Sequence, residues 1–141
     1  MKEPKWIDQR ALVLLHRESL AVHRGRAGIP DKGLLESALA RPRQLWTYEA
    51  TVDLGRLAAA YAVGVVRNHP FVDGNKRAAF LAVGLFLGLN GFQLVADPTD
   101  AARTVFALAA GEMDEPEFAA WIRTRMRRPS WTRPTSSAHK R

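Results

Sequence analysis

Two apolar stretches of helical length lie on either side of a short polar string near the middle of the chain. Residues 54–66 and 78–89 together contain one charged side chain, and the string from His69 to Arg77 lies between them. An apolar helix is stable in water only when other elements cover it. The pattern therefore predicts two buried helices joined by a polar loop that leads directly into the second helix.

The polar string has the residue types of an anion-binding loop. Gly74 lets the backbone bend close to a ligand, and the start of the following helix presents free N–H groups and the positive end of its dipole. Phosphate binds at such helix starts. Lys76 and Arg77 add two cations where the dipole disfavours them, which favours a negatively charged ligand. The ordinary alternative is a solvated surface loop, in which His, Asn, Gly and a Lys-Arg pair are all common.

The remaining pattern predicts a single all-α domain of about six helices, formed by residues 1–128. Aspartates stand where helices are expected to begin, and apolar residues recur at intervals of three and four. Pro42 is predicted to end the second helix and to leave 41–50 irregular, whereas 92–95 is expected to be extended. The predicted helices are 7–24, 31–42, 53–66, 78–89, 97–110 and 114–129.

Helix 78–89 is apolar on nearly every face and is predicted to be the buried centre of the bundle. The first helix is expected to turn Leu12, Leu15, Ser19 and Val22 inward, with Leu14 widening that face. The histidines outside the central string are expected to be structural or exposed; they are His16, His23 and His139.

The net charge of +7 is confined to the end of the chain. Seven of the 21 cations lie from Arg123 onward and no acid follows Glu117, so residues 1–122 carry no net charge. Residues 129–141 are rich in Pro, Ser, Thr and basic residues, and a flexible tail is predicted there. We therefore expect no direct binding of nucleic acid by the folded body.

The composition and the hydropathy pattern narrow the class of protein further. The chain of 141 residues has no cysteine, which excludes disulfides and thiolate metal sites. The first residues form no apolar signal segment, and no apolar run reaches the length needed to cross a membrane. We expect a cytoplasmic protein without membrane contact.

The central string resembles the signature of the Fic/Doc family, which reads His-Pro-Phe, two residues, Gly-Asn, one residue, Arg. His69-Pro70-Phe71, Gly74-Asn75 and Arg77 match it, and Asp73 stands at its acidic position. The resemblance extends over about residues 5–126 and implies a compact helical domain. Lys76 matches the Doc (death-on-curing) branch, where AMP-transferring Fic enzymes carry glycine. Gly74 follows the Fic form, and Phe80 stands where many Fic enzymes have a second arginine.

The resemblance implies a role for each residue of the string. His69 would be the general base that takes a proton from a target hydroxyl. Asp73 would hold Mg²⁺. ATP phosphates would be bound by Gly74, Asn75, Lys76 and Arg77, and the last two would also take part in catalysis by neutralising charge during transfer.

By the same resemblance, the chain is expected to be a Doc-like toxin. The expected reaction is transfer of the ATP γ-phosphate to a hydroxyl of a translation protein, elongation factor Tu, and the expected partner is a Phd-like antitoxin. No glutamate stands in the Ser/Thr, three residues, Glu, Gly/Asn pattern by which many Fic proteins inhibit themselves, which favours a separate inhibitor. The alternatives are transfer of AMP to a protein hydroxyl, and a non-catalytic or DNA-associated binding protein.

Overall fold

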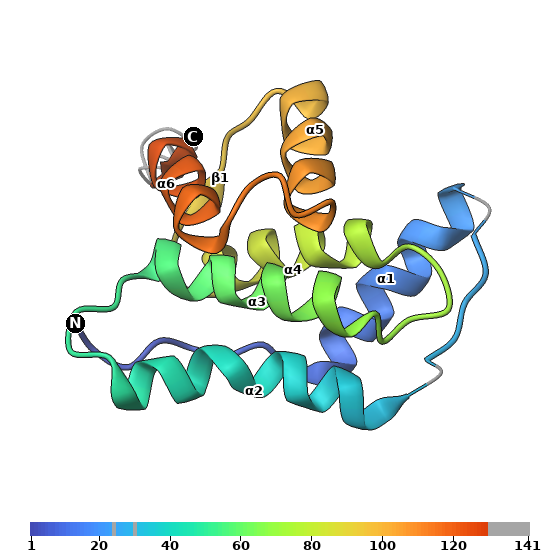
Figure 1. Ribbon diagram of the computed structural model, residues 1–141, viewed down its shortest axis with the longest axis horizontal. Helices are drawn as coiled ribbons and strands as arrows, with labels where there is room; N and C mark the ends of the chain where they lie inside the picture. The colour runs from blue at the N-terminus through green and yellow to red at the C-terminus, as the bar shows by residue number, and fades with distance from the viewer. Residues whose placement is uncertain (24, 30, 130–141) are drawn as a thin grey trace, which may run out of the picture.

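The computed structural model describes residues 1–23, 25–29 and 31–129 (Figure 1). This part of the chain holds six α-helices and two short strands, which confirms the predicted all-α domain. The predicted tail at 129–141 lies outside the described residues except for Pro129, so the division at 128 stays a prediction. The elements are α1 (Gln9–His23), α2 (Lys32–Tyr48), α3 (Leu54–Asn68), α4 (Asn75–Leu89), β1 (Gln93–Leu94), α5 (Pro98–Ala109), α6 (Glu115–Arg125) and β2 (Met126–Arg127).

Four helices begin at the aspartates that the sequence marks as caps. In each case the carboxylate accepts a hydrogen bond from the backbone N–H three residues later, which satisfies one of the unpaired donors of the first turn. The pairs are Asp31–Leu34, Asp53–Arg56, Asp97–Asp100 and Asp114–Glu117. Within the described ranges, no helix combines the length and the hydropathy needed to cross a bilayer.

Helix α3, rather than α4, is the buried centre. Ten of its 15 residues are buried, and α2, α4 and α6 pack along it (Figure 1). The prediction that 78–89 would be the centre is therefore wrong. One face of α4 leaves Gly84 and Gly88 exposed, and no described residue from another part of the chain lies within 4 Å of the position a Cβ would take. Glycine reads as apolar in a sequence pattern, but it brings little area to bury, so this face gains little from being covered.

Small residues allow α2 and α3 to lie very close together. A Cβ on Gly64 would lie 3.1 Å from the backbone of Ala38, so only glycine fits this crossing without a shift. Alanines at 58, 59, 60 and 62 are fully buried on α3 and keep its other contacts short. The close crossing fixes the direction in which α3 reaches the polar loop at its C-terminal end.

Helix α2 continues through Pro42 to Tyr48, so the predicted end at Pro42 and the predicted irregular stretch 41–50 are both wrong. Proline in a helix interior costs about 3 kcal/mol because it lacks an N–H and crowds the preceding turn. Here Pro42 is buried, and the continued helix brings the partly buried Trp46 onto the core. Tertiary packing outweighs the local preference.

The buried face of α1 also differs from the predicted one. Leu12, His16 and Leu20, spaced four residues apart, are buried at 0%, 1% and 5% exposure, whereas Leu14 and Val22 are 54% and 78% exposed. Helix α1 packs mainly on α4. Because α1 touches the core along one narrow line, only residues four apart in its sequence are buried. One of these residues is His16 and not an aliphatic residue.

Helix α6 is tied to α2 and α3 by buried charge. Glu115 is buried, and its carboxylate accepts hydrogen bonds from Arg41 of α2 and Arg56 of α3; Arg56 also pairs with Glu49. The helix ends at Arg125 and not at Pro129, because residues 126–127 form β2. This strand pairs antiparallel with β1, which confirms the extended segment predicted at 92–95.

Candidate active site

The loop between α3 and α4 turns the motif histidine out of the helical core. His69 follows α3 with φ +52° and ψ +53°, and it is the one non-glycine residue with positive φ in the described part of the chain. A positive φ is uncommon for a non-glycine residue, and here it ends α3 and turns the chain into the loop. The next two residues hold it in place, because Pro70 is buried and Phe71 is 2% exposed. The His69 side chain itself is exposed.

Asn75 holds the loop from its inner side. It is 4% exposed; its Oδ1 accepts the Phe71 N–H at 3.0 Å, and its Nδ2 donates to the Phe71 carbonyl at 3.0 Å. These two bonds fix the orientation of the amide, so Nδ2 also donates its second hydrogen to His69 Nδ1, 3.1 Å away. Because Nδ1 accepts this bond, a neutral His69 carries its own proton on Nε2. Asn75 therefore sets the state of the imidazole.

Gly74 begins α4 and leaves its first turn uncapped. It adopts φ +73° and provides no side-chain acceptor for the N–H groups of the first turn. A Cβ at this position would lie 3.1 Å from His16 Nε2 and 3.2 Å from a Leu20 methyl group. The predicted bend at Gly74 is thus confirmed, and both its conformation and its surroundings require glycine. The uncapped turn keeps the positive end of the α4 dipole free for an anion.

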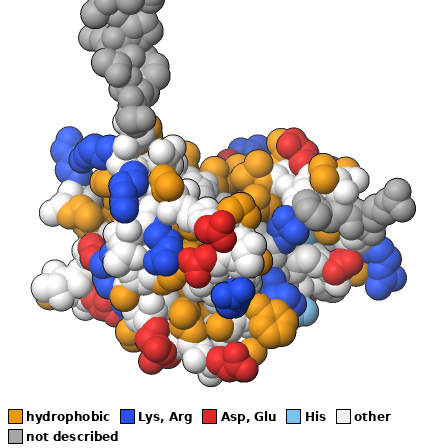
Figure 2. Space-filling model, turned by 90° about the horizontal axis from the view of Figure 1, so that it is seen from above, with side chains coloured by type: hydrophobic (Ala, Val, Ile, Leu, Met, Phe, Trp, Pro, Cys, Tyr) orange, Lys and Arg blue, Asp and Glu red, His pale blue; other side chains and the backbone are white. Residues whose placement is uncertain are grey.

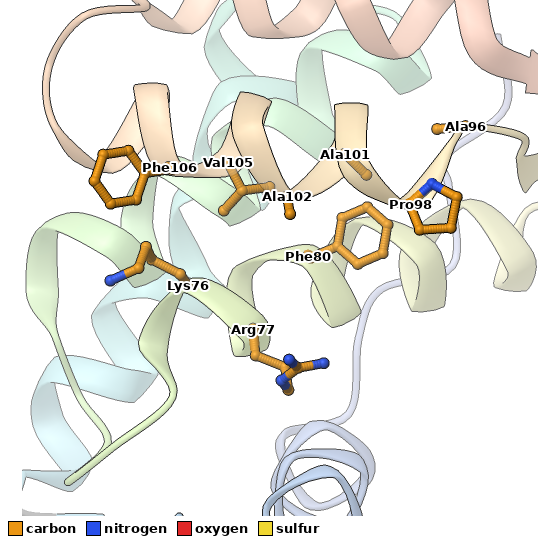
Figure 3. Close-up of a pocket in the computed structure, with 9 residues that line it drawn as sticks. All are labelled: Lys76, Arg77, Phe80, Ala96, Pro98, Ala101, Ala102, Val105 and Phe106. Atoms are coloured by element: carbon orange, nitrogen blue, oxygen red, sulfur yellow. The ribbon is translucent and has the colours of Figure 1, made fainter. Parts of the chain in front are cut away.

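The two motif cations occupy the first turn of α4 and point in different directions. Lys76 and Arg77 are both exposed. Lys76 Nζ lies 5.9 Å from the centre of the Phe106 ring, whereas the Arg77 guanidinium extends away from α5 (Figure 3). Among the described residues, no hydrogen bond or ion pair joins either cation to His69. The structure thus brings His69 and Asn75 into contact. Lys76 and Arg77 follow Asn75 in the first turn of α4.

Asp73 is an exposed carboxylate that is only partly used by the loop. Its Oδ1 accepts the N–H of Gly74 at 2.8 Å, and its Oδ2 lies 3.5 Å from the backbone N of Arg26. Each oxygen keeps lone pairs for a further partner. No group of three or more His, Cys, Asp or Glu side chains suited to hold a metal occurs in the described ranges. A cation at Asp73 would take most of its ligands from phosphate and water, as Mg²⁺ commonly does.

His16 belongs to the site although it lies outside the motif. From the middle of α1 its Nε2–H donates to the carbonyl oxygen of Asp73 over 2.7 Å, and its ring stacks on Phe71 with centroids 3.9 Å apart. Burial lowers the pKa of His16, so the ring is neutral at pH 7. Sequence reasoning assigned it no role. The signal was present in the four-residue spacing of Leu12, His16 and Leu20, which places the histidine on the buried face.

A groove of about 610 Å³ opens beside the cations, between α4 and α5. Apolar side chains line it, with Lys76 and Arg77 at its edge and the exposed Phe106 opposite Lys76 (Figure 3). Seen from the α5 and α6 side, hydrophobic side chains gather among scattered charged ones (Figure 2). The lining residues are Lys76, Arg77, Phe80, Ala96, Pro98, Ala101, Ala102, Val105 and Phe106.

Comparison with known proteins agrees with this geometry. Residues 6–87, which include the whole polar string, match the model of the Fic/DOC family. The chain is also 45% identical over 74 residues to a protein named Toxin Doc from Mycolicibacterium smegmatis; the matched region covers 52% of this chain and 57% of that protein. The family match spans more than half of the chain and contains His69, Gly74, Asn75 and Arg77 at the signature positions, so the chain belongs to the Fic/Doc family.

Proposed function

We propose that this chain is a Doc-type toxin that acts in the cytoplasm and transfers the γ-phosphate of ATP to a hydroxyl of a translation protein, elongation factor Tu. The observation that carries the proposal is the exposed His69 beside the uncapped start of α4, whose first turn carries Lys76 and Arg77. An imidazole next to a cationic anion site suits transfer of a phosphorus-containing group to a hydroxyl. The similarity to a protein named Toxin Doc supports the toxin part of the proposal.

The residues present fit ATP and Mg²⁺ by their chemistry. The first-turn N–H groups of α4 and the side chains of Lys76 and Arg77 would hold the phosphates. Asp73 would hold Mg²⁺ with the lone pairs that the loop leaves unused. When bound, the nucleotide supplies the phosphoryl group, and the metal neutralises part of its charge. The protein contributes position and electrostatic complementarity.

In this proposal His69 takes the proton of the target hydroxyl at Nε2. The ring can do so only when its own proton lies on Nδ1, whereas the bond from Asn75 favours the proton on Nε2. Changing the tautomer gives up that hydrogen bond and turns Nδ1–H toward the buried Asn75 donor, at a cost of about 1–3 kcal/mol. The contribution of a general base is typically 10²–10⁴-fold in rate, or about 3–5 kcal/mol. Asn75 thus keeps the imidazole inactive as a base at Nε2 until the hydroxyl selects the other tautomer.

The tautomer can be observed directly. Nitrogen-15 NMR of the protein, with ring nitrogens assigned by comparison with the His69→Ala variant, should show the Nε2–H form of neutral His69. In Asn75→Ala this preference should be weakened. A wild-type ring found mainly in the Nδ1–H form would contradict the assignment of the Asn75 bond.

Lys76 is the residue that favours transfer of the γ-phosphate over transfer of AMP. A lysine in the first turn of α4 adds charge and bulk where AMP-transferring relatives have glycine, so the nucleotide must bind differently. Gly74 favours the second candidate function, AMP transfer to a protein hydroxyl, because the position follows the Fic form. A non-catalytic or DNA-associated role is the remaining alternative, and removal of residues 129–141 tests it: toxicity that survives the removal excludes the basic tail from the mechanism.

A toxin must be restrained, and we infer a separate Phd-like antitoxin. The groove between α4 and α5 suits a partner segment with apolar anchors and a carboxylate, since its walls are apolar and its edge carries Lys76 and Arg77. Exposed Ala102 lines this groove, and exposed Ala120 on α6 is not among its lining residues. Ala102→Arg should keep toxicity but lose rescue by the protein encoded in the neighbouring gene, whereas Ala120→Arg should keep both. Equal rescue of both variants would contradict docking in this groove.

Growth after induced expression tests the toxin proposal. Wild type should stop growth and protein synthesis. His69→Ala should do neither, because it lacks the proposed base. It should still fold, because the exposed side chain contributes little to the core. His69→Gln is a second variant that retains polarity without the base. Immunoblots for equal amounts of folded protein are the control. Growth arrest by His69→Ala at equal abundance would show that the imidazole is not the base.

A further inference from the structure

We propose that His16 is a positioning residue for phosphate binding at α4, because it locks the Asp73–Gly74 peptide in one orientation. The inference rests on the proposed function, since it assigns the phosphates of the nucleotide to that helix start. His16 lies on α1, is 1% exposed and is joined to the motif across 57 residues of sequence by the Nε2–H bond to the Asp73 carbonyl. The polar string alone does not show this contact.

The orientation of this peptide matters because its two polar groups point in opposite directions. In a trans peptide the C=O and the N–H are antiparallel. With the Asp73 carbonyl bonded inward to His16, the Gly74 N–H turns away from α1, where Asp73 Oδ1 accepts it at 2.8 Å. One bond from His16 therefore sets both the direction of the peptide dipole and the position of the Asp73 carboxylate.

Gly74 makes such a lock necessary. A rotation of the Asp73–Gly74 peptide changes φ of Gly74, and glycine accepts either sign of φ at little cost. After a rotation the carbonyl oxygen would face outward, and its partial negative charge would lie beside the start of α4, where phosphate is expected. Gly74 thus permits the tight bend, but it also allows the peptide to adopt an orientation that opposes anion binding.

His16 suits this task by its burial and its packing. Its ring stacks on Phe71 at 3.9 Å, and its Nε2 lies so near Gly74 that a Cβ there would be only 3.1 Å away, so the ring is held close to the loop on both sides of Asp73. Phe71 is in turn held by both ends of the Asn75 amide. The loop is therefore clamped between α1 and α4. Leu12, one turn earlier on the same face, has no part in this hydrogen bond and provides a matched control.

Three variants separate positioning from simple support of the fold. His16→Leu removes the donor and keeps an apolar side chain of similar size. His16→Gln restores an N–H donor at the end of a side chain of similar length. Leu12→Ala weakens the packing of α1 on the core and leaves the His16 bond intact. Unfolding by urea gives the stability of each variant, so that binding is compared at equal folded fraction.

The readout is binding of inorganic pyrophosphate to the full chain, followed by the amide signals of Gly74 and Lys76, together with hydrogen exchange of the Gly74 amide. His16→Leu should weaken binding by about tenfold, because the freed Asp73 carbonyl can then turn toward the anion, and it should speed the exchange. His16→Gln, which restores the donor, should lie within about threefold of wild type. Leu12→Ala should bind like wild type when folded.

The outcomes distinguish this inference from the proposed function. If wild type binds pyrophosphate and His16→Leu binds it equally well, or if His16→Gln fails to restore binding, the positioning role is overturned and the proposed function stands. If wild type binds pyrophosphate but transfers no phosphate, only the proposed function fails. If wild type does not bind pyrophosphate at all, both are overturned.

Discussion

Replacing Glu115 with glutamine should destabilise the domain more than the loss of one exposed charge would. The Glu115 side chain is 9% exposed, and its carboxylate accepts two hydrogen bonds from Arg41, at 2.7 and 2.9 Å, and one from Arg56. Glutamine keeps the shape but presents an NH₂ group to guanidinium groups that also only donate. The change removes the negative charge that the two cations share and leaves one amide oxygen as the acceptor for both, at the meeting point of α2, α3 and α6.

The magnitude follows from how far each cation can reach water. Breaking a buried ion pair by removing one partner costs about 3–5 kcal/mol. The Arg41 and Arg56 side chains are 32% and 25% exposed, and Arg56 keeps its bond to Glu49, so both cations recover part of their solvation. Glu115 is also the first residue of α6, where a carboxylate is favoured by the dipole by about 0.5 kcal/mol. We expect a loss of about 3 kcal/mol.

Urea unfolding followed by circular dichroism measures this loss. With a slope of about 2 kcal/mol per M, typical of a small domain, the midpoint should fall by about 1.5 M. The control is Glu112→Gln, which removes an exposed carboxylate just before α6 and should change stability by less than about 0.5 kcal/mol. Equal shifts for the two variants would refute the claim that the buried charge cluster holds α6 against α2 and α3.

Four further variants test the geometry of the loop and of α4. Gly84→Ala should stabilise the domain by up to about 1 kcal/mol, because the site is helical and open. Gly74→Ala should destabilise it by about 1–2 kcal/mol, because φ of Gly74 is +73°. Stability changes of equal sign for the two variants in urea unfolding would contradict this. Burial lowers the pKa of His16, so the unfolded chain binds this proton first and stability should fall as pH drops below about 6.5. Thermal unfolding of His16→Gln should lack this component, and parallel pH curves for the two proteins would argue against it. Lys76→Gly should lower kcat for phosphoryl transfer about 10²–10³-fold, the effect of removing one group that stabilises developing charge; an unchanged kcat in steady-state assays would remove Lys76 from the mechanism.

Local signals in the sequence predicted the helix starts and the position of the loop correctly. Asp31, Asp53, Asp97 and Asp114 cap their helices as expected, because capping depends on residues three apart in the sequence. The bend at Gly74 also follows from local chemistry. These features need no knowledge of distant contacts.

The errors arose where tertiary contacts decide the outcome. Pro42 stays inside α2 because the continued helix packs on the core, and α3 is central because small residues such as Gly64 allow a neighbouring helix to approach it closely. The same holds for the site. The motif predicts His69 and the residues at the start of α4. The spacing of apolar residues on α1 can place His16 on the buried face, but its contact with the Asp73 carbonyl joins segments 57 residues apart and cannot be predicted locally.

The identity of the phosphate that is transferred tests the central claim most directly. Purified wild type, His69→Ala and elongation factor Tu should be incubated with Mg²⁺ and ATP labelled on either the γ- or the α-phosphate, followed by electrophoresis and detection of labelled protein. We expect label on elongation factor Tu from γ-labelled ATP with wild type, and none from α-labelled ATP or with His69→Ala. Label from α-labelled ATP alone would contradict phosphoryl transfer and support transfer of AMP.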